Sequence, residues 1–219
     1  MGSEMCIRDS ADTYSSALYV SEYELSTYME EMINAFRAYA DVKRVSLTYE
    51  SNFRYMNVWL DKDKMDSILK NLISNALKYT PEGGSVHIFA AETEDNWSVE
   101  VKDTGIGIPA SEQKKLFRMH FRGSNAINSK VTGSGIGLLL VWKLVRLHKG
   151  KINFNSTEGK GSCIKVIFPK KEKYYRKAVH SPKPGSEKVV YTESGVPRNI
   201  SLSLSLIHIS EPTRPLYIS

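Results

Sequence analysis

One stretch of apolar residues, from position 65 to 77, limits the possible folds more than any other feature of the sequence. These residues recur every three or four positions, at Met65, Ile68, Leu69, Leu72, Ile73, Ala76 and Leu77. The spacing predicts an α-helix with one continuous buried face. Pro81 follows, and it ends the predicted helix because its ring disfavours helical geometry at the preceding residue. Such a helix needs a second layer of structure to cover its apolar face.

Alternating apolar residues on both sides of this helix predict strands. The alternation covers residues 44–50, 55–61, 86–91, 97–102, 152–156 and 163–168. Helical spacing returns in residues 22–39 and 137–148, and a short helix is expected at the front of residues 111–132. The mixture predicts one domain made of a sheet layer and a helix layer.

The two ends of the chain differ in composition from its middle. Residues 1–18 and 201–219 are interpreted as non-native or disordered segments. Residues 170–200 are rich in Lys, Ser, Pro and Gly and are typical of a linker. The folded domain is therefore predicted to span residues 19–169.

Charge and cysteine content restrict the classes of partner. The net charge is +6, and residues 170–219 hold nine Lys or Arg against four acids, so the middle of the chain is only modestly basic. This argues against a nucleic-acid partner. Cys6 and Cys163 lie far apart in the sequence, which predicts neither a disulfide framework nor a zinc site. We expect a cytoplasmic setting without direct membrane contact.

The first candidate motif lies on the helix with the apolar stripe. Asn71, Asn75 and Lys78 are spaced so that they form one polar edge beside that stripe. An amide oxygen can ligate Mg²⁺, and a lysine ammonium can approach the phosphates of the same nucleotide. An ordinary solvated helix face is the alternative interpretation.

The second motif directly follows a predicted strand and runs from Asp103 to Pro109. An aspartate at a strand end can accept a hydrogen bond from the exocyclic amine of adenine. Gly105 and Gly107 allow a tight turn and a close approach to a flat ligand, on which Ile108 can pack. The alternative is a glycine turn with a capping aspartate.

Two further glycine motifs come later in the chain. Gly133, Gly135 and Gly137 run directly into a predicted helix, whose free N–H groups favour an anion such as phosphate. A dinucleotide-binding interpretation is disfavoured because no strand immediately precedes these glycines. Gly159 and Gly161 precede the last predicted strand, and by themselves they indicate only a turn.

The order of these motifs is more specific than any one of them. It resembles the ATP-binding domain of sensor histidine kinases, in the superfamily that also holds DNA gyrase, heat-shock chaperones and mismatch-repair ATPases. The resemblance covers about residues 21–169. It implies an α+β fold, a two-layer α/β sandwich of the Bergerat type, in which helices cover one face of a mixed, mostly antiparallel sheet.

The resemblance also implies roles for individual residues. Asn75 is the implied Mg²⁺ ligand, Lys78 is an implied phosphate contact, and Asp103 is the residue implied to recognise adenine. Residues 116–122 resemble the aromatic box of the ATP lid, with some departures from its usual pattern. No catalytic residue is implied, and the implied nucleotide-binding set is Asn71, Asn75, Lys78, Tyr79, Asp103, Gly105, Gly107, Ile108, Arg122, Gly133, Gly135, Gly137, Leu138 and Ser162.

The implied reaction is transfer of the γ-phosphoryl group of Mg·ATP to a histidine on a separate dimerisation domain. None of the five histidines lies in the setting that the family uses for the acceptor, so the chain is expected to bind ATP without phosphorylating itself. The receiver domain of a response regulator is a second implied partner, and the implied parent is a membrane-anchored sensor. Two alternatives remain open, a non-catalytic nucleotide-binding regulatory module and a gyrase-type or mismatch-repair-type ATPase.

Overall fold

A five-stranded sheet forms one layer of the domain. The computed structural model describes residues 17–113, 115–116, 137–175 and 179–180. The sheet has the order β2-β4-β5-β7-β6, with bounds β2 Ser46–Ser51, β4 Ser85–Glu92, β5 Asn96–Asp103, β7 Gly161–Pro169 and β6 Lys151–Thr157. Only the β2–β4 pair is parallel among these strands, and the other three pairs are antiparallel.

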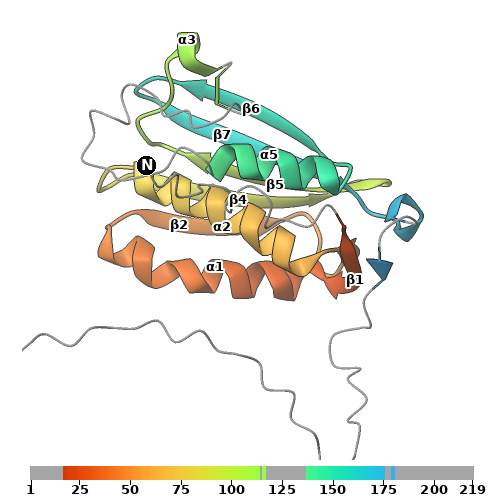
Figure 1. The fold of residues 1–219 in the computed structure, drawn as a ribbon. Helices are drawn as coiled ribbons and strands as arrows, with labels where there is room; N and C mark the ends of the chain where they lie inside the picture. The colour runs from red at the N-terminus through yellow and green to blue at the C-terminus, as the bar shows by residue number, and fades with distance from the viewer. Residues whose placement is uncertain (1–16, 114, 117–136, 176–178, 181–219) are drawn as a thin grey trace, which may run out of the picture. The chain divides into compact units, whose positions relative to one another are not determined.

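Three helices form the other layer, and Figure 1 shows them together on one face of the sheet. They are α1 Leu25–Val42, α2 Lys62–Tyr79 and α5 Gly137–Leu147. Every residue of the predicted stripe on α2 is buried, which confirms that prediction. The sheet contributes Trp97 and Phe168, whose ring centroids lie 4.7 Å apart. The predicted α+β two-layer sandwich is therefore the observed fold.

A smaller sheet, which the sequence analysis did not predict, lies beside this sandwich. Its order is β3-β1-β8, with bounds β3 Asn57–Leu60, β1 Tyr19–Glu24 and β8 Val179–His180. The helix that was expected over residues 22–39 therefore begins at Leu25, three residues later than predicted. Glu24 ends β1 and caps α1, because its carboxylate accepts hydrogen bonds from the N–H groups of Ser26 and Thr27.

The described structure continues beyond Pro169. A 3₁₀ helix, η1 Glu172–Tyr175, places the fully buried Tyr175 ring in a small apolar cluster with Leu18 and Val20. The Tyr175 hydroxyl donates to the carbonyl oxygen of Pro169 at 3.2 Å. Two residue pairs then join β8 to β1 in parallel. The segments before and after the sandwich therefore meet each other in this small sheet.

His148 links the end of α5 to the start of α2, and it is fully buried. Its Nε2 accepts the N–H of Asp61 at 3.3 Å, so Nδ1 carries the proton and donates to the carbonyl oxygen of Leu144 at 2.9 Å. Burial lowers the pKa of this imidazole, against the hydrogen bond to Leu144, which raises it. The contacts and the burial both favour the neutral ring.

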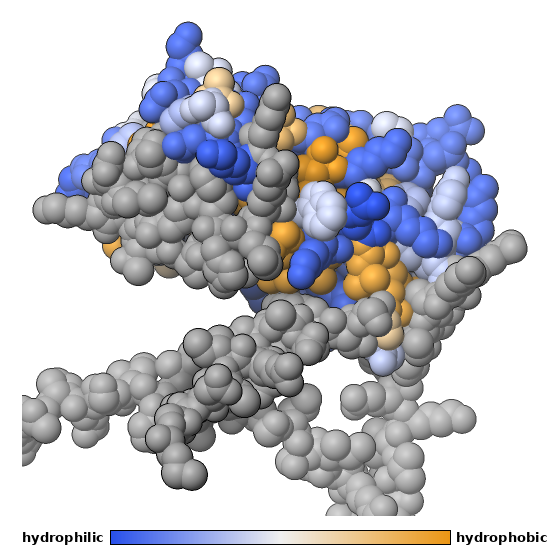
Figure 2. Space-filling model, turned by 45° about the horizontal axis from the view of Figure 1, so that its top comes forward, coloured by the Kyte–Doolittle hydropathy of each residue, from blue (hydrophilic) through white to orange (hydrophobic). Residues whose placement is uncertain are grey.

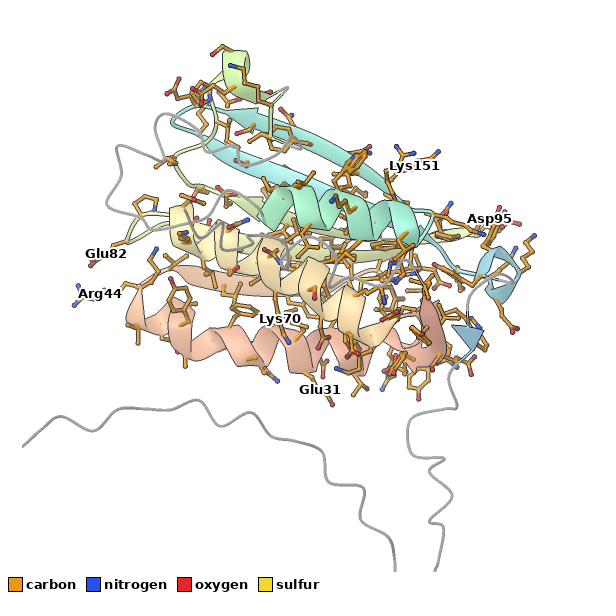
Figure 3. The ribbon with its side chains drawn as sticks, viewed as in Figure 1. Glu31, Arg44, Lys70, Glu82, Asp95 and Lys151 are labelled. Atoms are coloured by element: carbon orange, nitrogen blue, oxygen red, sulfur yellow. The ribbon has the colours of Figure 1, made fainter. Side chains whose placement is uncertain are left out.

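Charged side chains lie around the outside of the domain. Figure 3 shows Arg44 and Glu82 together at one edge, where they form an ion pair with an N–O distance of 2.5 Å. On the face seen in Figure 2, apolar residues appear as interrupted areas among hydrophilic ones. Within the described ranges, no helix is both long and apolar enough to cross a bilayer.

Candidate functional site

The polar edge of α2 carries the first group of predicted site residues. Asn71 donates from Nδ2 to the carbonyl oxygen of Ser67 at 2.7 Å, which leaves its Oδ1 pointing away from the helix backbone. The amide of Asn75 makes no hydrogen bond within the described part of the chain. Lys78 lies over the ring of Tyr79, with Nζ 5.2 Å from the ring centroid. All four side chains are half-buried, as expected of groups lining an open site.

The start of α5 lies against this polar edge. A Cβ atom on Gly137 would lie 2.5 Å from Asn71 Oδ1, so only glycine fits here without a shift of that amide, and it would lie in ordinary contact with Asn75 Nδ2 at 3.7 Å. Leu138 follows and is half-buried. The first turn of α5 therefore lies directly against the amide of Asn71. Arg122, Gly133 and Gly135 lie outside the described residues, as do residues 117–121 of the segment that resembles the aromatic box.

Asp103 lies at the end of β5, where two backbone groups hold its carboxylate. Its Oδ1 accepts the N–H of Gly105 at 2.8 Å and the N–H of Ser162 at 3.2 Å. Burial raises the pKa of this carboxyl above its ordinary value, and the two backbone hydrogen bonds oppose that shift. The protein thus fixes one oxygen, Oδ1, and no residue in the described ranges donates a hydrogen bond to Oδ2.

The loop after Asp103 is pinned to α2 on one side and to the β6–β7 turn on the other. Ile106 donates its N–H to the carbonyl oxygen of Tyr79 at 3.2 Å and accepts the N–H of Gly159 at 2.8 Å. A Cβ atom on Gly105 would lie 2.6 Å from the carbonyl oxygen of Tyr79. Gly107 has φ +62°, and a Cβ atom there would lie 2.0 Å from the carbonyl oxygen of Thr157. Both glycines are therefore required by close backbone packing.

Ile108 is held by a buried serine that the sequence analysis missed. Ser156 accepts the N–H of Ile108 at Oγ, at 2.9 Å. Gln113, at the end of the short helix α3 Ala110–Gln113, donates from Nε2 to the carbonyl oxygens of Ile108 at 3.0 Å and Ser156 at 2.8 Å. The only sequence signal for Ser156 was its place three residues before the Gly159 turn.

Lys43 is a second residue that the sequence analysis missed. Its Nζ donates to the carbonyl oxygens of Leu77 at 2.8 Å and Lys78 at 2.9 Å, which lie in the last turn of α2. A cation at a helix C-terminus donates hydrogen bonds to these otherwise unpaired carbonyl groups and interacts favourably with the helix dipole. Lys43 therefore holds the end of α2 that carries Lys78 and Tyr79.

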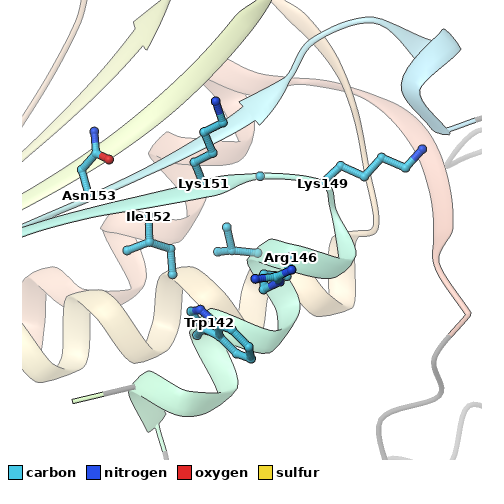
Figure 4. A pocket seen from close by; sticks show the side chains of 8 residues that line it. Trp142, Arg146, Lys149, Lys151, Ile152 and Asn153 are labelled. Carbon is cyan, nitrogen blue, oxygen red and sulfur yellow. The ribbon is translucent and has the colours of Figure 1, made fainter. Parts of the chain in front are cut away.

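A separate hollow of about 600 Å³ lies at the other end of α5 and is shown in Figure 4. Its lining residues are Trp142, Val145, Arg146, Lys149, Gly150, Lys151, Ile152 and Asn153. None of the predicted nucleotide-binding residues lines it. The convergence of α2, the loop after Asp103 and the start of α5 is the stronger candidate site, because its chemistry is specific.

Comparison with known proteins gives a family match over most of the sandwich. The family model described as histidine kinase-, DNA gyrase B- and HSP90-like ATPase matches residues 60–172. The chain is 43% identical over 121 residues to the sensor histidine kinase WalK of Bacillus subtilis (strain 168), covering 54% of this chain and 20% of WalK. It is 34% identical over 149 residues to the adaptive-response sensory kinase SasA of Thermosynechococcus vestitus (strain NIES-2133 / IAM M-273 / BP-1), covering 68% of this chain and 39% of SasA.

Solved structures show the same fold. The catalytic domain of histidine kinase ThkA superposes with a TM-score of 0.63 at 24% identity, covering 72% of this chain and 99% of that domain. The matched part of the chain thus covers almost all of that catalytic domain, and the chain spans well under half the length of the two kinases named above.

Proposed function

Because the chain belongs to the family of histidine kinase-, DNA gyrase B- and HSP90-like ATPases, we propose that it binds Mg·ATP and donates the γ-phosphoryl group to a histidine of a separate dimerisation domain. The chain carries the ATP-binding catalytic domain of a sensor histidine kinase. The observation that carries the proposal is the convergence of the α2 polar edge, the Asp103 loop and the start of α5. The kinases among its relatives support this activity for the family.

The described side chains suit an adenine nucleotide. Asp103 offers Oδ2 to the exocyclic amine of the base, with Ile108 and Tyr79 as apolar contacts. Lys78 and the N–H groups at the start of α5 supply positive charge for the phosphates. Asn71 belongs to the same edge, and Arg122, Gly133, Gly135 and Ser162 complete the proposed set.

Asn75 is the proposed Mg²⁺ ligand. Its amide has no hydrogen-bond partner in the described part of the chain and lies beside Gly137. No group of three or more carboxylate, histidine or thiol side chains is assembled as a metal site among the described residues. One amide oxygen fits Mg²⁺, which keeps several waters and binds mainly through substrate phosphates. Bound Mg²⁺ would neutralise charge on those phosphates.

We infer that the polar edge of α2 positions the phosphoryl group and offers no base to a water molecule. Asn71 carries an amide that cannot take a proton from water, which favours transfer to a protein side chain over hydrolysis. The acceptor histidine therefore comes from the dimerisation domain, and a receiver domain accepts the phosphoryl group afterwards. ThkA has been solved in complex with the response regulator TrrA, which supports a receiver as the second partner. We place this domain in the cytoplasm of a membrane-anchored parent, where ATP is present.

Calorimetric titration of the chain with ATP, in Mg²⁺ and in a chelator, tests nucleotide binding. We expect Asp103→Asn to weaken ATP binding at least tenfold in either condition, because it removes a charged acceptor. Asn75→Ala should remove only the gain in affinity that Mg²⁺ brings. Asn153→Ala, at an exposed asparagine on β6, is the control and should change neither. A folded chain that binds no ATP would refute the proposal.

Transfer is tested by adding a histidine-containing dimerisation domain from a relative such as WalK, with ATP labelled at the γ-phosphate. Label on the histidine supports the kinase. Release of inorganic phosphate without that domain would indicate a gyrase-type ATPase. ATP binding with neither outcome would indicate a non-catalytic regulatory module.

A further inference from the structure

The hollow between the end of α5 and the start of β6 combines apolar side chains with an exposed aromatic ring. Val145 and Ile152 line it from the helix and from the strand. Trp142 of α5 also lines it, and this ring is 37% exposed. The guanidinium of Arg146 lies over the ring, 5.0 Å from its centroid. Figure 4 shows Ile152 pointing from β6 toward the helix that carries Trp142 and Arg146. An apolar side chain from outside would therefore find a ring and an aliphatic surface to pack against.

The surroundings of the hollow are positively charged. Residues 113–157 contain no Asp or Glu. Lys149 and Lys151 line the hollow together with Arg146, and Figure 4 shows the two lysine side chains extending outward from it. The ammonium of Lys149 donates to the carbonyl oxygen of Tyr174, a neutral group that leaves its charge in place. Within the described ranges, none of these three cations forms an ion pair with a carboxylate.

An acidic protein segment is the occupant that this combination fits. A carboxylate can form a bidentate pair with a guanidinium and a single hydrogen-bonded pair with an ammonium. A bilayer or a nucleic-acid duplex presents its charges over a broad surface, and cations spread over a wide face suit it better. Here the cations surround a hollow of about 600 Å³, which has room for a side chain and a short length of backbone.

We propose that this hollow is a docking site for an acidic segment of a partner protein. The segment places an apolar side chain against Trp142 and Ile152, and its carboxylates pair with Arg146 and Lys151. The inference does not depend on the proposed function, because none of the proposed nucleotide-binding residues lines the hollow. A partner bound here would therefore not compete with ATP.

Selection from a library of displayed random peptides, with the full chain as bait, tests the chemistry of the occupant. We expect the selected peptides to share an apolar residue flanked by Asp or Glu. Their binding, measured by fluorescence anisotropy, should weaken as salt is raised, because salt screens the ion pairs. A selection that yields no peptide, or one that yields a neutral or basic consensus, would overturn the inference.

Variants of the chain locate the binding of a selected peptide. Arg146→Glu should weaken it at least tenfold, because the change places a like charge against the carboxylates. Trp142→Ala should weaken it about tenfold, because it removes the ring on which the apolar side chain packs. Arg37→Glu and Tyr39→Ala, at exposed side chains of α1, are the matched controls and should bind the peptide normally. Unchanged binding in both Arg146→Glu and Trp142→Ala would show that the peptide binds elsewhere and would overturn the inference.

Two other anionic partners are assayed with the same variants, vesicles that contain phosphatidylserine and a DNA duplex. Binding of either that is tighter than peptide binding and is lost in Arg146→Glu would overturn the choice of a protein segment. Calorimetric titration with ATP should give the same affinity for Arg146→Glu and Trp142→Ala as for the unmutated chain. Failure of docking and failure of the nucleotide site are thus read from separate measurements.

Discussion

Substitution of Tyr175 tests where the folded domain ends. Its ring is 1% exposed, and it packs against Leu18 and Val20, which precede the sandwich. Removing a buried aromatic side chain costs about 3–5 kcal/mol of unfolding free energy. Tyr175→Ala should therefore lower the free energy of unfolding by that amount, which corresponds to a fall in Tm of about 10 °C for a domain of this size.

Two companion variants resolve the sources of this loss. Tyr175→Phe keeps the ring and removes only the hydrogen bond to the Pro169 carbonyl oxygen, so it should cost about 1 kcal/mol. Tyr39→Ala removes a tyrosine that is 45% exposed on α1 and should cost less than about 0.5 kcal/mol.

The assay is urea unfolding of the full chain, followed by circular dichroism and by tryptophan fluorescence, since Trp97 is fully buried in the core. Coincidence of the two transitions is required for a single free energy. A loss below about 1 kcal/mol in Tyr175→Ala would refute the reasoning. Residues 172–175 would then not stabilise the domain, and the predicted end at Pro169 would stand.

Three further predictions follow from the contacts of the site and its surroundings. Lys43→Met should lower the free energy of unfolding by about 1.5–3 kcal/mol in urea titrations, whereas Lys70→Met, at an exposed ion pair on α2, should cost less than about 1 kcal/mol. Gly107→Ala should weaken ATP binding in calorimetry, because alanine disfavours the left-handed backbone conformation and its Cβ would clash with the carbonyl oxygen of Thr157. Gly159→Ala faces the same backbone cost at φ +73° but has open space around its Cβ, so this variant should bind ATP normally. Burial lowers the pKa of His148, so its imidazole stays neutral in the folded state while it protonates in the unfolded state. The free energy of unfolding should therefore fall as pH drops below about 6.5, and His148→Gln should weaken that pH dependence in urea titrations at pH 5 to 7.

Local periodicity was enough to predict the main layers. The stripe on α2 has one period throughout, so its buried face could be read directly from the sequence. The β4–β5 hairpin around residues 93–95 follows from two alternating runs and a polar turn. By contrast, residues 22–24 at the end of β1 fall within the expected helix over residues 22–39. Only the cap formed by Glu24 decides where α1 begins.

The unpredicted parts of the site depend on contacts between distant residues. Lys43 meets the end of α2 from 34 residues away, and Ser156 meets Ile108 from 48 residues away. For neither residue does the neighbouring sequence predict which distant residue it contacts. The motif residues could be found because their chemistry requires a fixed order of glycines, asparagines and one aspartate. The residues that hold them in place follow only from the folded topology.

The pairing of β1 with β8 has a mechanical consequence. The two strands run in the same direction, so the chain arrives at the start of β1 and departs from the end of β8. A pull on the chain from both sides would load their hydrogen bonds in shear, with every bond sharing the force at once. Such a pull would therefore load this pair of strands before it loads the layers that carry the asparagines and Asp103.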